Sequence, residues 1–236
     1  MTEGSRAIRW SRVLLVLTTL APLAVFVGIA GMRLGVWDWQ IGYSVLTLQV
    51  GLALAALGTF AALGGVIVAL GEPRARLMAL GGVILGGATA GLYGLHLSQT
   101  GVGILSASAT SVPAQATTAL TDPPVFTGAL ADRRQAASAA EATVFQTCAA
   151  TTVPTQVAPG AAAYALEQAG FEVLGFGVAR ADGTREGTWF GFVHDATIRI
   201  RPGATDVRVA SREARDDGGE ACRLVTRIVA ELQPGA

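Results

Sequence analysis

The sequence has few charged residues and no lysine. Charged residues make up 14% of the 236 residues, against about 25% in an ordinary soluble domain, and hydrophobic residues make up 51%. This composition excludes an intrinsically disordered chain and an ordinary cytosolic protein. The 17 basic residues, all arginine, are balanced by 17 acids. Because no strongly basic region results, we expect no nucleic-acid partner.

Residue types that often carry catalysis or bind metals are also scarce. The chain has only two cysteines and two histidines. It contains no phosphate-binding loop, no Gly-x-Ser-x-Gly elbow, no His-Glu-x-x-His motif and no dinucleotide-binding fingerprint. His96 lies at the edge of an apolar stretch, and His194-Asp195 has no second ligand at a metal-binding spacing. We therefore expect no metal and no cofactor, and the sequence favours a non-enzymatic role.

Charge is absent from three long hydrophobic stretches in the first half of the chain. A helix needs about 20 apolar residues to cross a bilayer core. Residues 13–32, 44–70 and 77–97 meet this requirement. Residues 13–97 therefore predict three transmembrane helices in contact with a lipid bilayer. Their lack of charged residues argues against an ion or proton pathway.

The distribution of arginine predicts how these helices are oriented. The N-terminal arm, residues 1–12, carries three arginines, and the loop between the second and third stretches carries Arg74 and Arg76. Basic loops favour the cytoplasm, so we expect the bacterial inner membrane, with residues after 97 periplasmic or extracellular. The first stretch could instead be a cleaved signal peptide, but its length favours an anchor. Cleavage would not change the side of the C-terminal half.

Small residues recur four positions apart in the third stretch. The steps are Gly82 to Gly86 and Gly87 to Gly91. Lipid tails give helices no hydrophobic drive to associate, and small residues allow close backbone packing. These steps could pack the three helices together, or they could form a face for another membrane protein or for a second copy of this chain.

The second half of the chain has the composition of a linker followed by a soluble domain. Residues 98–119 are mostly small and uncharged, which is typical of a linker. Residues 120–236 are enough for one modest core. Apolar and polar residues alternate over 196–201 and 206–212, with a Pro202-Gly203 turn between them, and this pattern predicts an antiparallel hairpin.

Further strands and two helices complete the expected domain. Residues 171–179 and 187–193 are rich enough in aromatic and β-branched residues to predict two more strands. A helix is expected over 161–169, before Gly170. A second helix is predicted near the end of the chain, after Asp216 and Asp217, by apolar residues at helical spacing. These are Ala221, Leu224, Val225, Ile228, Val229 and Leu232. The fold class is therefore α+β with an antiparallel sheet and a C-terminal helix.

Several short motifs in this region resemble a bacterial family. They are Thr121-Asp-Pro-Pro-Val-Phe126, Phe190-Gly-Phe-Val-His-Asp195, Ile198-Arg-Ile200 and Asp206-Val-Arg-Val-Ala-Ser-Arg212. In order and spacing they are similar to the domain of unknown function 1499, over about residues 120–232. Members of that family often carry N-terminal membrane spans. The sequence departs from the family pattern after Arg212, where the asparagine of the family is absent. The resemblance implies an architecture and no activity.

The two cysteines, Cys148 and Cys222, fall in the half expected outside the cytoplasm. An oxidising compartment permits a disulfide there, and the 75-residue loop it would close would stabilise the domain by about 2–4 kcal/mol. Two buried free thiols are the alternative. Nothing in the sequence resembles a Cys-x-x-Cys or Cys–His catalytic motif.

Four arginines are candidates for binding an anionic lipid or the carboxylates of a partner. Strand alternation places Arg199 and Arg201 on one face, and the hairpin would add Arg208 and Arg212. The alternative is a solvated face whose charge is neutralised by nearby acids. These acids are Glu186, Asp195, Asp206 and Glu213.

Three functions remain open at the level of sequence. The favoured one is a non-enzymatic accessory or scaffold protein of the cell envelope or of a membrane complex. The second is a binding module for a lipid or small apolar ligand with an aromatic pocket wall. The residues of that wall would be Phe171, Phe176, Trp189, Phe190 and Phe192. The third is a hydrolase, which would require Asp195 and Asp216 to converge with His194.

Overall fold

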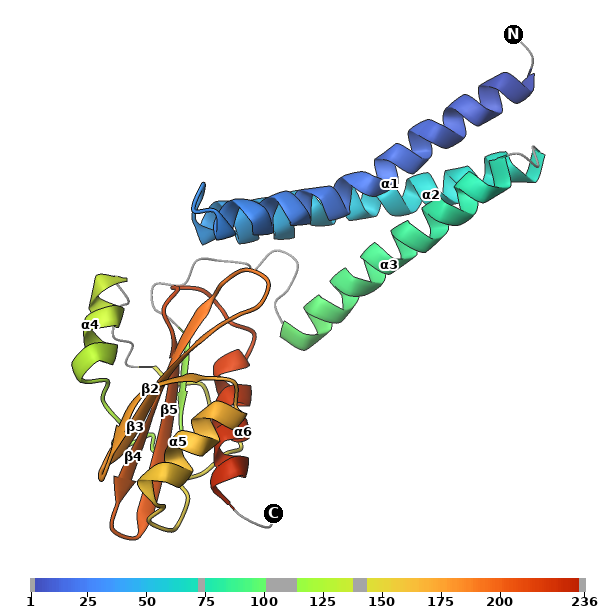
Figure 1. The fold of residues 1–236 in the computed structure, drawn as a ribbon. Coiled ribbons are helices and arrows are strands. Elements are labelled where there is room, and N and C mark those ends of the chain that lie inside the picture. The colour runs from blue at the N-terminus through green and yellow to red at the C-terminus, as the bar shows by residue number, and fades with distance from the viewer. Residues whose placement is uncertain (1–2, 72–74, 101–113, 138–143, 234–236) are drawn as a thin grey trace. The chain divides into compact units, whose positions relative to one another are not determined.

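The computed structural model describes residues 3–71, 75–100, 114–137 and 144–233 (Figure 1). Arg74, most of the expected linker and the side chain of His96 lie outside the described part of the chain. The chain divides into two units, Met1–Ala107 and Ser108–Ala236.

The first unit consists of helices. They are α1 (Glu3–Arg33), the π-helix η1 (Gln40–Gly51), α2 (Leu52–Gly71), which continues η1 directly, and α3 (Arg76–Thr100). Three helical segments are long and apolar enough to cross a membrane: Ile8–Arg33, Gln40–Gly71 and Arg76–Leu95. The prediction of three long apolar helices is confirmed, and helices of this length and composition imply contact with a lipid bilayer.

Glycines and one tyrosine allow the helices to pack closely. A side chain at Gly58 of α2 would lie 3.3 Å from the Thr18 Cα of α1. The Tyr93 hydroxyl of α3 donates a hydrogen bond of 2.7 Å to the Thr47 carbonyl oxygen in η1. Since polar groups in a membrane must be satisfied within the protein, this bond gives a buried phenol and a π-helical carbonyl each a partner.

The second unit is built on a five-stranded antiparallel sheet in the order β1-β5-β4-β3-β2. The strands are β1 (Gln115–Thr117), β2 (Glu172–Gly177), β3 (Arg180–Glu186), β4 (Val193–Arg201) and β5 (Ala204–Ser211). Strands β4 and β5 form the hairpin expected from the alternating pattern, with Ile198 opposite Val207. The predicted α+β fold is therefore confirmed.

Two helices cover one face of this sheet (Figure 1). They are α5 (Pro159–Gln168), which ends before Gly170 at φ +85°, and α6 (Glu220–Leu232). All six residues of the predicted α6 stripe are buried. They meet the inward side chains of β4 and β5, among them Ile198, Val207 and Val209, in one aliphatic core.

The expected strand over 187–193 is wrong. Only Val193 belongs to a strand, and residues 187–192 form the loop between β3 and β4. The third strand is instead β3, whose inward positions are the small residues Ala181 and Gly183. A side chain at Gly183 would come within 3.1 Å of the Phe171 Cβ, so this strand has no apolar pattern by which it could be found.

Two short elements were not anticipated. Residues 115–117, at the end of the range with linker composition, form the edge strand β1 beside β5. Helix α4 (Gly128–Ala136) covers the second face of the sheet, where Phe126 and Leu130 pack on Ala210. The sheet thus lies between two layers, with α5 and α6 on one side and α4 on the other.

Candidate functional site

The four candidate arginines all lie on the sheet face that α4 covers. Arg199 and Arg201 alternate along β4 with the core residues Ile198 and Ile200. The register places Arg208 opposite Thr197 on the same face. The structure therefore brings the predicted arginines together with the acids of the two strands.

Asp195 is the centre of one ion-pair group. Its carboxylate is fully buried and accepts hydrogen bonds of 2.8 and 2.7 Å from Nε and Nη2 of Arg212. Arg134, from α4, donates to the same carboxylate at 3.1 Å, and the Thr184 hydroxyl donates at 3.0 Å. Charge-assisted bonds of this kind are the strong ones, so Asp195 joins β3, β4 and α4.

Asp206 is the centre of a second group at the other end of the same strands. The buried carboxylate lies 2.8 Å from the Nη2 atom of Arg199 and 2.7 Å from that of Arg201. The Thr152 hydroxyl also donates to it, at 3.1 Å. Arg199 makes a further ion pair of 3.0 Å with the exposed carboxylate of Asp122. Arg201 is the most open of the four arginines, with 44% of its side chain exposed.

Arg208 is buried and lies under α4 and the segment that precedes it. Two of its nitrogens donate to Gln115 Oε1, at 3.2 and 2.7 Å, and a third donates to the Pro124 carbonyl at 3.0 Å. Its guanidinium lies 4.5 Å from the centre of the Phe126 ring, and that of Arg134 lies 4.6 Å from the same ring. Cation–π contacts of this kind are stronger when they are desolvated.

Of the acids expected near the arginines, Asp195 and Asp206 pair with them directly. Glu213 accepts hydrogen bonds from the Val193 amide and the Ser211 hydroxyl, and Glu186 is exposed at the end of β3. Helix α4 therefore covers much of the sheet face that carries the four arginines, and acceptors of the same chain already bind their guanidinium groups. An external anion could reach the inner guanidinium groups only if these ion pairs were broken first.

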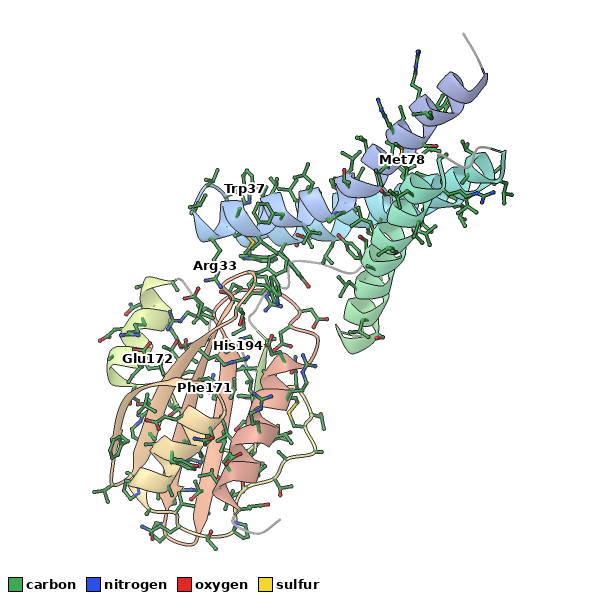
Figure 2. The ribbon with its side chains drawn as sticks, turned by 45° about the vertical axis from the view of Figure 1, so that its right-hand side comes forward. Arg33, Trp37, Met78, Phe171, Glu172 and His194 are labelled. Carbon is green, nitrogen blue, oxygen red and sulfur yellow. A yellow bond between two sulfur atoms is a disulfide. The ribbon has the colours of Figure 1, made fainter. Side chains whose placement is uncertain are left out.

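His194 lies on the opposite, core-facing side of β4 and is 1% exposed (Figure 2). Its Nε2 atom is 3.7 Å from the carboxylate of Asp217. Asp217 also accepts 2.8 Å hydrogen bonds from the Gln146 side chain and the Ala221 amide. Burial alone would raise the pKa of Asp217, but the neighbouring imidazole, the Gln146 amide and the Ala221 amide together hold this pKa well below its usual value.

The structure does not assemble the constellation that a hydrolase would need. Adjacent residues in a strand point to opposite faces, so His194 and Asp195 lie on different sides of the sheet. Asp216 is exposed, and its carboxylate accepts a bond from the Gly218 amide. Its neighbour Asp217 is the acid beside His194. The His194–Asp217 pair is buried and joins β4 to the start of α6.

The two cysteines form a disulfide in the structure, with a Cα–Cα distance of 5.5 Å. It joins the extended segment around Cys148 to the first turn of α6 at Cys222, and both residues pack against the aliphatic core. The bond lies close in sequence to Gln146 and Asp217. The disulfide and the Gln146–Asp217 hydrogen bond therefore both hold the segment around Cys148 against the start of α6.

The five aromatic residues considered as a pocket wall are not brought together. Phe171 is buried in the core beneath α5 (Figure 2). Phe176 lies on the edge strand β2 with 60% of its surface exposed. Trp189 is 71% exposed in the β3–β4 loop. Phe190 and Phe192 stack on one another in that loop, with ring centres 5.7 Å apart.

The structure separates the four candidate glycines of α3 into two pairs. Side chains at Gly82 and Gly86 would come within 4.0 and 3.3 Å of Ala62 in α2. At Gly87 and Gly91, a side chain would meet no atom within 4 Å among the described residues. The first pair packs the helices together, and the second pair faces away from them.

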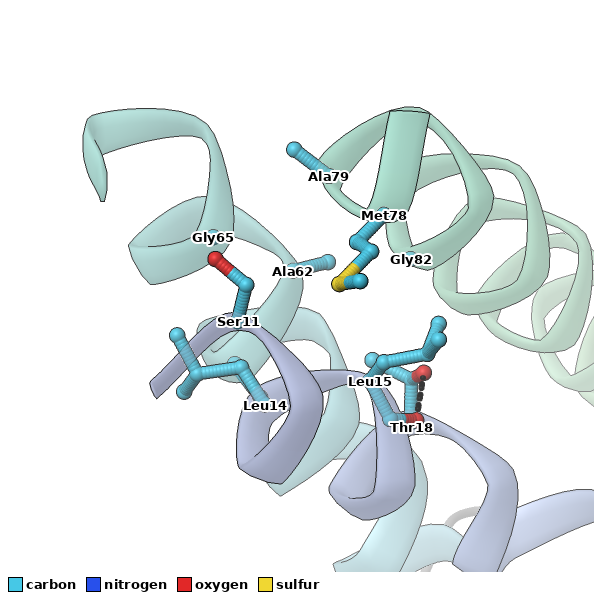
Figure 3. Close-up of a pocket in the computed structure, with 10 residues that line it drawn as sticks. Ser11, Leu14, Leu15, Thr18, Ala62, Gly65, Met78, Ala79 and Gly82 are labelled. Atoms are coloured by element: carbon cyan, nitrogen blue, oxygen red, sulfur yellow. Dashed lines mark hydrogen bonds between the residues drawn. The ribbon is translucent and has the colours of Figure 1, made fainter. Parts of the chain in front are cut away.

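A small cavity lies between α1, α2 and α3 (Figure 3). Its volume is about 10 Å³, and Ser11 and Thr18 are the polar side chains on its wall. The Thr18 hydroxyl already donates to the Leu15 carbonyl at 2.6 Å. This space holds about one water molecule, whereas pockets for lipids or drug-sized ligands measure about 300–1,000 Å³.

The fold and these sites define a class of protein: a chain with three helices long and apolar enough to cross a membrane, followed by an α+β domain that has an internal ion-pair layer. Residues 115–232, half of the chain, match the family described as protein of unknown function (DUF1499), and the chain belongs to this family. No curated protein and no solved structure matches the chain.

Proposed function

We propose that this protein is a non-enzymatic accessory protein of the bacterial cell envelope. Three spans anchor it in the inner membrane, with the N-terminus in the cytoplasm and the α+β domain on the outer side. The domain is a rigid scaffold that a membrane complex uses, and the outward face of α3 is where a membrane partner packs.

The distribution of arginine and the disulfide both support this orientation. Arg9 and Arg12 lie at the start of the first apolar helical segment and Arg76 begins the third, whereas Arg33, at the end of the first segment, is balanced by Asp38 in the connection that follows. Basic residues are enriched on the cytoplasmic side of membrane helices, which supports a cytoplasmic position for the start of the first segment and the start of the third. Disulfides such as Cys148–Cys222 form and persist in oxidising compartments, so this bond supports a position of the domain outside the cytoplasm.

The ion-pair layer is the observation that carries the scaffold proposal. Asp195 and Asp206, the acids that β4 and β5 place on the polar sheet face, are both buried and are both used to hold arginines. A catalytic carboxylate has to reach a substrate, and these two reach only their own chain. Charges placed in this way fix strands and α4 in one arrangement, which suits a domain that presents a constant surface.

The separation of the glycines indicates where a partner helix would pack. Gly87 and Gly91 present a small-residue step away from the chain's own helices. Close approach of two backbones in a membrane depends on such steps. Gly86 is one residue away and packs on Ala62, so it provides a matched control on the inward face.

The test is purification of the full chain from its native membrane in a mild detergent, followed by identification of bound proteins and lipids. We expect a stoichiometric membrane protein that is lost from the Gly87→Leu/Gly91→Leu variant. A Gly86→Leu variant should instead lower the thermal stability of the helical unit, because its side chain would collide with Ala62. Trapping the thiols of intact cells with a maleimide should find Cys148 and Cys222 oxidised.

Two results would contradict the proposal. A protein that purifies alone but carries one enriched lipid would favour the lipid-binding module. Cys148 and Cys222 that are fully reduced in cells would place the domain in the cytoplasm and overturn the orientation.

A further inference from the structure

Strand β2 (Glu172–Gly177) is the last strand of the sheet in the part of the chain that the structure describes. The outer edge of such a strand carries backbone N–H and C=O groups that can pair with another strand. Proteins commonly protect an edge with lysine or proline, and β2 contains neither. Four of its six residues are exposed, so the strand is accessible along most of its length. β2 is therefore an accessible edge that lacks the usual protective residues.

The pairing of β2 with β3 decides to which face of the sheet each β2 side chain belongs. Val173 and Phe176 lie opposite the inward residues of β3, so both belong to the core side, which α5 and α6 cover. An irregularity between Val173 and Gly175 leaves Leu174 as an extra residue, and Leu174 packs on the α4 side. The other residues of the α4 side lie opposite the polar residues of β3. They are Glu172, Gly175 and Gly177.

The order of faces along β2 is the same when it is read from either end. It runs α4 side, core side, α4 side, α4 side, core side, α4 side. Two antiparallel copies of β2 therefore match face for face in one register, whereas a shift by one residue would place core-side residues against the α4 side. The opposed pairs in the matching register are Glu172 with Gly177, Val173 with Phe176, and Leu174 with Gly175.

We propose that two copies of this chain associate through their β2 strands in this register, so that their two sheets become one antiparallel sheet. A two-fold axis relates the copies, and each contact occurs twice. Val173 is half-buried and Phe176 is 60% exposed in the single chain. Across the axis the Phe176 ring would cover Val173 of the second copy, and aromatic–β-branched pairs of this kind stabilise neighbouring strands. The proposal uses only the α+β domain and does not rest on the proposed function.

The charges on the α4 side are complementary in the same register. Glu172 is exposed and, among the described residues, has no ion-pair partner. It would lie opposite Gly177 of the second copy, and Arg180 is the residue of β3 that pairs with Gly177. Because Gly177 places no side chain between them, the Glu172 carboxylate can approach the Arg180 guanidinium of the second copy. Arg180 also binds Asp182 of its own chain at 2.8 Å, so Glu172 adds an attraction and replaces none.

The irregularity in β2 is compatible with this pairing. A bulge commonly bends an edge strand and thereby ends its pairing. Here the irregularity lies between Val173 and Gly175, at the centre of the strand, where the two-fold axis would pass. The irregularities of the two copies then face each other, and the residues on either side keep one register. A side chain at Gly175 would meet no described atom within 4 Å, so the space beside this central position is open.

Cysteine cross-linking of the full chain in liposomes tests the register. Both native cysteines are paired, so an introduced cysteine supplies a free thiol. Val173→Cys and Phe176→Cys chains with different tags are reconstituted together and oxidised with copper phenanthroline. We expect a dimer that carries both tags in the mixed sample. Each variant alone should give little dimer, because two copies of the same cysteine would lie about 7–10 Å apart along the strands, which is too far for a disulfide.

The mass of the full chain in a mild detergent, measured by light scattering, tests the surface. We expect twice the mass of the 24.1 kDa chain, and a fall to the single mass in Phe176→Lys, because a lysine on a strand edge opposes pairing. Leu120→Lys is the matched control. Leu120 is 56% exposed and follows β1 at the other edge of the sheet, so this variant should remain dimeric. Thermal unfolding at the same temperature in both variants shows that the fold is retained.

Three results would overturn the proposal. They are a single-chain mass for the wild type, cross-linking that is equal in the mixed and unmixed samples, and a dimer that persists in Phe176→Lys. A dimer of the last kind would use another surface, such as the outward face of α3, and would leave the proposed function intact.

Discussion

The two faces of the sheet are both largely covered, but by opposite chemistry. On one face Ile198, Val207 and Val209 pack against the apolar stripe of α6. On the other, Asp195 and Asp206 hold arginines beneath and beside α4. The same two strands supply both faces, because alternate residues point to opposite sides. Alternation of apolar and charged residues therefore does not by itself mean that the charged side is solvated.

The two faces also respond differently to change. An aliphatic core tolerates a smaller side chain at a cost that grows with the cavity left behind. A buried ion-pair group loses more when one partner is removed, because the remaining charges stay in a medium that solvates them poorly.

The largest effect is expected for Asp195→Asn. The substitution keeps the shape of the side chain but leaves Arg134 and Arg212 without their shared carboxylate, which should cost about 3–5 kcal/mol. Hydrogen exchange of the β4 and β5 amides in the full chain would measure the loss. Ile198→Ala, on the other face of the same strand, should cost about 2–5 kcal/mol by creating a cavity. A near-neutral Asp195→Asn would show that the ion-pair layer contributes little to stability.

Asp217→Asn tests the polar cluster on the aliphatic side and should have a smaller effect. Loss of the charged acceptor weakens the bonds from Gln146 and Ala221 and should cost about 1–3 kcal/mol at pH 7. Because the pKa of Asp217 is lowered in the folded protein, its contribution is complete above its unfolded value of about 3.9 and declines as the pH falls below it. The difference between wild type and variant should therefore shrink below about pH 4. A difference that is constant from pH 7 to pH 3 would contradict this assignment.

Arg201→Gln should have the smallest effect, below about 1 kcal/mol. Its side chain is nearly half exposed, and Asp206 keeps Arg199 as a partner. The same hydrogen-exchange measurement would detect the change, and 0.5 M salt should reduce the difference further because exposed charges are screened. A cost as large as that of Asp195→Asn would mean that exposure does not separate the two ion-pair groups.

The elements that follow one strong period could be predicted from sequence. The α6 stripe and the β4–β5 hairpin each repeat apolar residues at the spacing of one regular structure. The three spans are long enough that composition alone identifies them. Strand β3 breaks this rule because Phe171 occupies the space next to Gly183, so the strand carries almost no apolar residue on its inner side.

The candidate site was only partly predictable for a related reason. Alternation puts Arg199 and Arg201 on one face, but the cover over that face comes from α4, a nine-residue helix with little apolar periodicity. Because α4 was not predicted, nothing in the sequence indicated that Arg134 forms an ion pair with Asp195. Asp217 was expected near the start of α6, yet its contact with His194 depends on how strands and helix pack, which spacing along the chain does not encode.

The disulfide has a consequence for proteolysis. Cys148 and Cys222 lie on either side of α5 and four of the five strands in the described sheet. A single cut within a turn of that segment, such as Pro202-Gly203, would leave both fragments covalently joined. The nicked chain should migrate as one band until a reductant is added. A cut before Cys148, by contrast, would separate the domain core from its membrane anchor at once in denaturant.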